Sequence, residues 1–114
     1  MPYLTIQTNK SIDAEKTLTL MSNASKMVAN LLSKPETYVA VAVPPAIPMM
    51  FAGSDAPLAY LELKSIGLPE SSTPNLSQSL CNLINKELEI PLNRIYIEFS
   101  NAPRHMWGWD GRTF

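Results

Sequence analysis

The feature that most constrains the fold is one order of hydrophobic patterns that occurs in both halves of the chain. In the first half, residues 3–8 alternate between apolar and polar side chains, as a half-buried strand does. A helical pattern follows from Ser11 until Lys34-Pro35 stops it, and Tyr38 to Val43 is β-prone and closed by Pro44-Pro45. This half predicts a strand, a helix and a second strand.

Capping residues and spacing define the first predicted helix. Ser11 is the predicted N-cap, with Asp13 and Glu15 placed favourably in the first turn. The predicted core-facing side chains recur at helical spacing: Leu18, Met21, Ala24, Val28, Leu31 and Leu32.

The second half repeats the plan. Leu58 to Ile66 is a predicted strand, Thr73 caps a helix that has Pro74 in its first turn, and Arg94 to Phe99 is the last strand. The helix has one apolar face, formed by Leu76, Leu80, Leu83, Ile84 and Leu88.

Each half has the length of a βαβ unit, whose crossover puts its helix on one face of the sheet. We therefore predict an α+β fold of two βαβ repeats, with a four-stranded mixed sheet and both helices on one face, in a single domain spanning residues 1–114. We expect Leu61, Leu63 and Tyr96 on the uncovered face. A partly apolar face of that kind favours self-association.

Composition excludes several classes of function. Charged residues make up 17% of the 114 residues, against about a quarter in an average protein, which also favours an oligomer. The formal net charge is −1 and no basic cluster occurs, so we expect no nucleic-acid binding. No run of residues is long and apolar enough for a membrane span or a leader, and we expect a cytoplasmic protein, with unconventional secretion left open.

Cys81 and His105 are the single cysteine and the single histidine of the chain. They allow neither an intrachain disulfide nor a structural zinc site, and we expect no metal or cofactor. Cys81 is expected to be a packed, inert thiol in the second helix. His105 is expected to be solvated, with a place at the rim of a pocket as the alternative.

Pro2 follows the initiator methionine and precedes the first strand. If Met1 is removed, Pro2 carries a rigid secondary amine, which can act as a general base. An α-amino group has a reference pKa of about 7.7 to 8.0, and an apolar site beside a cation lowers it further. Proline at this position is weak evidence by itself.

Several short segments are informative when their order and spacing are considered together. They are Pro2, Lys34-Pro35 before Tyr38-Val39-Ala40-Val41, Ser65-Ile66-Gly67, Arg94-Ile95-Tyr96-Ile97, Gly108-Trp109 and Thr113-Phe114. Their order and spacing closely resemble the family of macrophage migration inhibitory factor and D-dopachrome tautomerase, in the tautomerase superfamily, over essentially the whole chain. The resemblance implies a homotrimer and a cofactor-independent keto-enol tautomerase that acts on phenylpyruvate-like α-keto acids.

The resemblance also implies roles for particular residues. Pro2 would be the catalytic base and Lys34 a cationic contact for the substrate carboxylate. The backbone N–H of Ile66 would be a second donor, and Tyr96 would reach the site from a neighbouring subunit. Without the resemblance, Lys34 could simply complement the helix dipole, and Tyr96 could be an ordinary strand residue.

Other implied positions surround the pocket or depart from the family pattern. Trp109 and Phe114 would wall the pocket. Glu98 stands where relatives often carry an asparagine, and Trp107 replaces a small apolar residue, so both change the expected substrate site. A carboxylate at position 98 also leaves open a hydratase-type activity in which Glu98 activates water.

A second alternative is a cytokine-like signalling module that binds a receptor and retains only a vestigial pocket. Ala46 replaces an acidic residue of some vertebrate relatives and weakens that alternative. Leu58 and Leu61 occupy the places of a Cys-x-x-Cys pair, so we expect no thiol redox activity.

Overall fold

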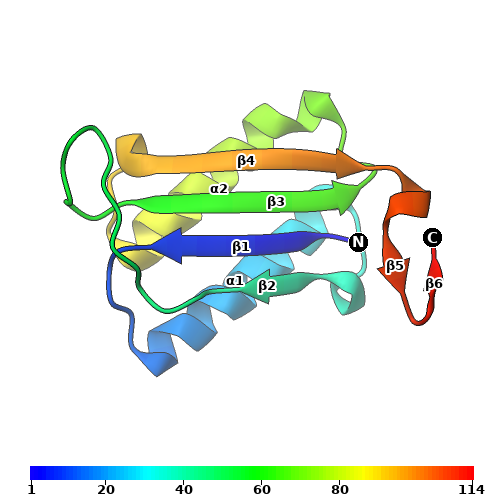
Figure 1. Cartoon of the computed structure of the whole chain (residues 1–114), viewed down its shortest axis with the longest axis horizontal. Helices are drawn as coiled ribbons and strands as arrows, with labels where there is room; N and C mark the ends of the chain where they lie inside the picture. Colours follow the sequence, from blue (N-terminus) through cyan, green and yellow to red (C-terminus); the bar gives the residue numbers. More distant parts are fainter.

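The computed structural model describes residues 1–114 and has one four-stranded mixed sheet in the order β2-β1-β3-β4 (Figure 1). Strand β1 is parallel to β2 and antiparallel to β3, which is parallel to β4. The strands are β1 Tyr3–Thr8, β2 Ala40–Ala42, β3 Ala59–Ile66 and β4 Ile95–Ala102. The predicted α+β architecture is confirmed.

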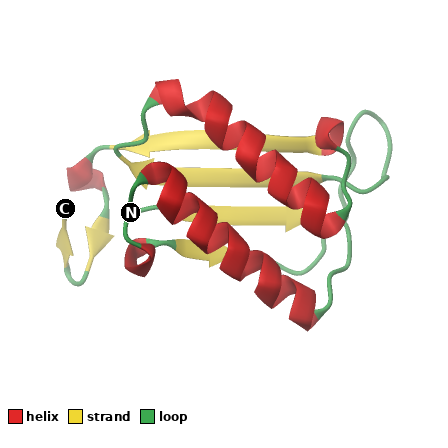
Figure 2. Cartoon of the chain, turned by 180° about the vertical axis from the view of Figure 1, so that it is seen from behind, coloured by secondary structure: helices red, strands yellow, loops and turns green.

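Helices α1, Ala14–Leu32, and α2, Thr73–Leu88, both lie on one face of the sheet (Figure 2). Short strands β5, Gly108–Trp109, and β6, Arg112–Thr113, form a separate hairpin at the C-terminus. Neither α1 nor α2 combines the length and the apolar composition that crossing a bilayer requires.

The core lies between the sheet and the two helices. Leu61 and Leu63 are fully buried in it, so their expected place on the uncovered face was wrong. Side chains alternate along a strand, and Tyr60 pairs with Tyr96, which puts both tyrosines on the opposite face from Leu61. The uncovered face carries mostly polar and aromatic side chains: Tyr3, Thr5, Gln7, Tyr60, Glu62, Lys64, Tyr96 and Glu98. An apolar sheet face therefore gives no argument for self-association.

Helix α1 begins two residues later than its predicted Ser11 cap allows. Asp13 is the N-cap, and its carboxylate accepts a hydrogen bond of 2.7 Å from the backbone N–H of Lys16. Leu18 is 65% exposed, whereas Leu20 is fully buried. The buried side chains of α1 are Leu20, Ala24, Val28 and Ala29, and the predicted Leu31 and Leu32 pack against the core while partly buried.

Helix α2 buries all five predicted leucine and isoleucine side chains. Ser72, rather than Thr73, occupies the N-cap position, and Pro74 lies in the first turn as predicted. A 3-10 turn over Glu70–Ser72 precedes the helix, and the Thr73 hydroxyl donates to the Glu70 carbonyl at 2.9 Å. This local bond draws Thr73 into the helix itself.

Strand β2 is shorter than the predicted Tyr38 to Val43. A 3-10 turn covers Glu36–Tyr38, and only residues 40–42 pair with β1. Strand β1 begins at Tyr3, opposite Ala40, so the residues before Ala40 have no neighbouring strand to pair with. The backbone N–H of Ala40 bonds the Pro2 carbonyl at 3.0 Å, which fixes the start of β1.

Candidate functional site

The candidate site lies at the edge of the sheet where β1 begins. Pro2 is buried there, directly before Tyr3, and it borders a cavity of about 390 Å³. The cavity is lined by Met1, Pro2, Tyr3, Thr37, Tyr38, Val39, Ala40, Trp107 and Trp109. A larger hollow of about 720 Å³ lies beside the loop of residues 46–50, but it contains none of the predicted site residues.

Lys34 reaches the same edge of the sheet. Helix α1 ends at Leu32, and Ser33 turns the chain out of the helix with a left-handed φ of 52°. Lys34 therefore lies one residue past the C-cap of α1 and outside its last turn, in which no basic residue occurs. The Lys34 ammonium nitrogen lies 3.7 Å from where a Cβ on Gly67 would be.

That contact places the ammonium group beside the end of β3. Ile66 is the last residue of β3, is 7% exposed and pairs with Ala102 of β4. Gly67 follows with a φ of +67°, a conformation that a side chain disfavours. The backbone of Ile66 and the Lys34 side chain thus lie at one end of the sheet.

The N-terminal amino group lies in a cationic environment. Burial is the largest cause that lowers the pKa of the Met1 amine from its ordinary value of 8.0. The positive charges of Lys34 and then Arg104 lower this pKa further, because the protonated amine is repelled by both. Arg104 was not among the predicted site residues. The sequence gives no sign that Arg104 is near the N-terminus, because this proximity depends on where β4 ends in the sheet.

Aromatic side chains form one wall of the cavity. The ring of Trp109 meets Tyr38 edge-on at 5.7 Å between centroids and stacks on Phe114 at 5.8 Å. The backbone N–H of Phe114 donates to the Trp107 carbonyl at 3.2 Å, which ties the C-terminus to this wall. Trp107 and Trp109 thus line the cavity directly, whereas Phe114 supports Trp109 from behind. Sequence reasoning placed Tyr38 in a strand and missed it as a wall residue.

Tyr96 and Glu98 lie elsewhere in the same chain. Tyr96 is 62% exposed near the start of β4, and its ring lies 4.7 Å from that of Phe51. Pro2 is at the opposite end of the sheet, since Tyr3 pairs with Lys64 while Tyr96 pairs with Tyr60. Within one chain, neither Tyr96 nor Glu98 reaches the cavity.

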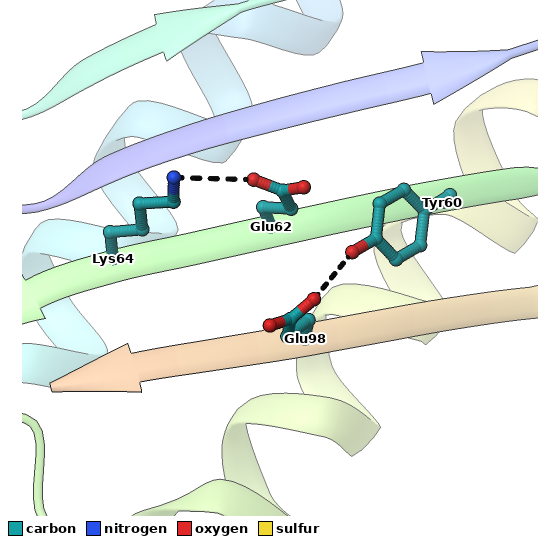
Figure 3. Close-up of polar contacts among 4 residues, drawn as sticks. All are labelled: Tyr60, Glu62, Lys64 and Glu98. Carbon is teal, nitrogen blue, oxygen red and sulfur yellow. Dashed lines mark hydrogen bonds and ion pairs between the residues drawn. The ribbon is translucent and has the colours of Figure 1, made fainter.

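Glu98 takes part in a polar cluster on the uncovered face (Figure 3). Its carboxylate accepts a hydrogen bond of 2.7 Å from the Tyr60 hydroxyl, and Lys64 and Glu62 form an ion pair at 3.5 Å alongside. The bond to Glu98, then burial and the charge of Glu62, raise the pKa of Tyr60 to about 12. The Glu98 carboxylate therefore already has a hydrogen-bond partner, Tyr60, in its own chain.

The two remaining candidate side chains are not in the cavity. Cys81 is a half-buried free thiol that packs against the core, and His105 is exposed in the 3-10 turn Arg104–Met106. No group of three or more His, Cys, Asp or Glu side chains is arranged to hold a metal ion.

Comparison with known proteins decides the family. The family model described as macrophage migration inhibitory factor (MIF) matches residues 1–114. This chain belongs to the MIF family. A MIF homolog of Trichinella spiralis is 40% identical over 116 residues, covering 100% of both chains. The MIF of Xenopus tropicalis is 36% identical over 115 residues, covering 100% of this chain and 99% of the relative.

Solved MIF structures have the same fold. The MIF homologue of Prochlorococcus marinus superposes with a TM-score of 0.92 at 40% identity and covers 98% of each chain. The MIF of Trichinella spiralis has a TM-score of 0.90 at 38% identity, covering 98% of this chain and 99% of that one.

Proposed function

We propose that this MIF-family chain is a cofactor-independent keto-enol tautomerase that acts on phenylpyruvate-like α-keto acids. The observation that carries the proposal is the burial of Pro2 at a cavity lined by two tryptophans, close enough to Lys34 for that charge to act on the N-terminal amine. After removal of Met1, the Pro2 nitrogen would be a secondary amine in this environment. Family membership supports an isomerase activity of this general kind.

The proposed reaction needs only proton transfers. The neutral amine of Pro2 takes a proton from the carbon next to the ketone, and the resulting ammonium returns one proton to the enolate oxygen. The group must be neutral near pH 7 to start the cycle. Burial and the charges of Lys34 and Arg104, which lower the pKa of the Met1 amine, would act in the same direction on Pro2.

The remaining site residues would bind the substrate. Lys34 would bind its carboxylate, and the backbone N–H of Ile66, at the same end of the sheet, would donate a second hydrogen bond. Trp107 and Trp109 present apolar surface to an aromatic ring, with Phe114 stacked behind Trp109.

Completion of the site would need a neighbouring subunit, and we propose a homotrimer. The 62% exposed Tyr96 is too far along the sheet to reach Pro2 of its own chain, but it is free to enter a neighbour's cavity. Glu98, two residues later on the same face, would accompany it. Light scattering should give about three times the 12.6 kDa chain mass, and a monomer at micromolar concentration would refute the shared site.

The decisive experiment compares protein with verified N-termini. Mass spectrometry separates processed from Met1-bearing protein, and each form is assayed for phenylpyruvate tautomerisation. The Met1-bearing form should be inactive, because its Pro2 nitrogen is an amide, and Pro2→Gly should lose most of the activity. Equal rates for the processed and Met1-bearing forms would show that Pro2 is not the base.

A signalling role is the second candidate, and the names of the vertebrate relatives favour it. A protein-binding function of the surface should survive Pro2→Gly, whereas catalysis should not. A hydratase activity of Glu98 has less support, because its carboxylate lies outside the cavity of its own chain and bonds Tyr60.

A further inference from the structure

A second cation stands beside the candidate site because of the way β3 and β4 end together. Ile66, the last residue of β3, pairs with Ala102, the last residue of β4. The chain that leaves β4 therefore emerges at the edge where Lys34 lies over Gly67 and where β1 begins. Arg104 is two residues past Ala102, in the 3-10 turn Arg104–Met106 that follows β4, and its charge acts on the N-terminal amine. Figure 1 shows this turn at the end of the sheet where the N-terminus lies.

The backbone of this turn is fixed to the cavity wall. The Met106 N–H donates to the Pro103 carbonyl at 3.0 Å, and the Trp107 N–H donates to the Arg104 carbonyl at 3.3 Å. Trp107 itself lines the cavity. Arg104 is thus anchored by its own carbonyl to a residue that a bound ligand would touch.

The guanidinium group of Arg104 has no partner in the chain. The two ion pairs of the structure join Lys64 to Glu62 and Arg112 to Asp110, and no side-chain hydrogen bond involves Arg104. The Arg104 charge is nevertheless close enough to the N-terminal amine to lower its pKa, after the larger effect of Lys34. Two cations therefore act on the amino group of Met1, which borders the cavity, and an α-keto carboxylate would occupy only one of them.

We propose that Arg104 binds a second carboxylate, so that the preferred substrates are α-keto acids with another carboxylate at the far end of the molecule. This inference rests on the tautomerase function proposed above. Lys34 would hold the α-keto carboxylate near the base, and Arg104 would hold the distal carboxylate. A guanidinium fork matches the two oxygens of a carboxylate, which gives this end of the site geometric as well as electrostatic selectivity. The reaction remains the same internal proton shift.

The kinetic test compares 4-carboxyphenylpyruvate with phenylpyruvate on protein whose removal of Met1 has been verified. The wild type should favour the dicarboxylate about tenfold in kcat/KM, mainly through KM, because both ends of the substrate are then bound. Arg104→Gln should lower kcat/KM for the dicarboxylate about tenfold more than for phenylpyruvate, because any effect of the lost charge on the pKa of Pro2 is common to both substrates. Arg104→Lys should recover part of the preference, since it restores the charge without the fork.

Lys86→Gln is the matched control, because it removes one positive charge from an exposed position near the far end of α2. It should leave both substrates unchanged. Equal use of the two substrates by wild type, or equal losses on both substrates in Arg104→Gln, would overturn the proposal.

A binding experiment separates this inference from the catalytic proposal. The chain has two tryptophans and both line the cavity, so quenching of their fluorescence reports on this site. We expect 4-carboxyphenylacetate to bind about tenfold more tightly than phenylacetate in wild type and in Lys86→Gln, and equally in Arg104→Gln. If this binding preference is found but the processed protein turns over neither α-keto acid, the tautomerase proposal is refuted while the proposed anion site is supported. Equal binding of both probes by wild type would refute the anion site.

Discussion

Arg94 organises the loop between β2 and β3, and Arg94→Met should destabilise the protein substantially. The guanidinium group donates hydrogen bonds of 2.9–3.1 Å to four loop carbonyls: Phe51, Ser54, Ala56 and Pro57. It also lies 5.3 Å from the centroid of the Phe51 ring, which in turn contacts Tyr96. Methionine keeps much of the side-chain length and removes every donor.

The expected loss of stability depends on which hydrogen-bond partners each of the four carbonyls keeps in Arg94→Met. Phe51 and Ser54 bond each other in both directions, and the Ala56 carbonyl keeps a weak bond from Asn9 at 3.4 Å. Only the exposed Pro57 carbonyl loses its sole protein partner, and water can replace it. A hydrogen bond from a charged donor contributes about 1.5–3 kcal/mol, so we expect a total loss of about 2–3 kcal/mol rather than four times that contribution.

The assay is thermal and urea unfolding followed by circular dichroism, with every variant at one protein concentration, because self-association would shift the midpoint. The expected loss corresponds to a melting temperature lower by about 10–15 °C. Arg112→Met is the matched control, since the Arg112 guanidinium has one exposed ion pair with Asp110 at 3.3 Å and lies 5.1 Å from the centroid of the Trp109 ring, and its loss should cost about 1 kcal/mol. If Arg94→Met is no more destabilising than this control, the loop is not held by Arg94.

Three further predictions concern backbone strain and titration. Ala52 has a left-handed φ of 54° before Gly53 in a tight turn, so Ala52→Asn should stabilise the chain by about 0.5–1 kcal/mol in the same unfolding assay, and a loss would contradict the turn assignment. In Met1-bearing protein, Lys34→Met should raise the pKa of the terminal amine without restoring its full ordinary value, because burial remains the larger cause; NMR titration of the amine that finds no change would refute the contact. Glu98→Gln should lower the pKa of Tyr60 from about 12, measured by phenolate absorbance. The raised pKa stabilises the fold fully below the unfolded value of 10.0, and this contribution is lost as the pH rises towards 12, so an unchanged titration in Glu98→Gln would refute the role of the hydrogen bond.

Local patterns in the sequence were sufficient for the two helices, for the four strands of the main sheet and for the fold class, but not for the β5–β6 hairpin. The alternation over residues 3–8 and the apolar face of residues 76–88 each report burial on one side of a periodic element, and both predictions are confirmed. Ends of elements were less predictable. Asp13 rather than Ser11 is the N-cap, because both side chains can cap a helix and only the residue directly before the first helical residue, Ala14, does so.

Tertiary structure decided which face of the sheet is covered and which distant residues meet. Leu61 and Tyr96 lie on opposite faces because of the pairing between β3 and β4, and no local pattern contains that register. Landmarks in the sequence predicted Pro2 and Lys34 as site residues, but Arg104 became a neighbour of the N-terminus only through the parallel pairing that ends both strands at one edge. Hydrophobic periodicity is a property of a few consecutive residues, whereas a site depends on contacts between segments that only the packed chain brings together.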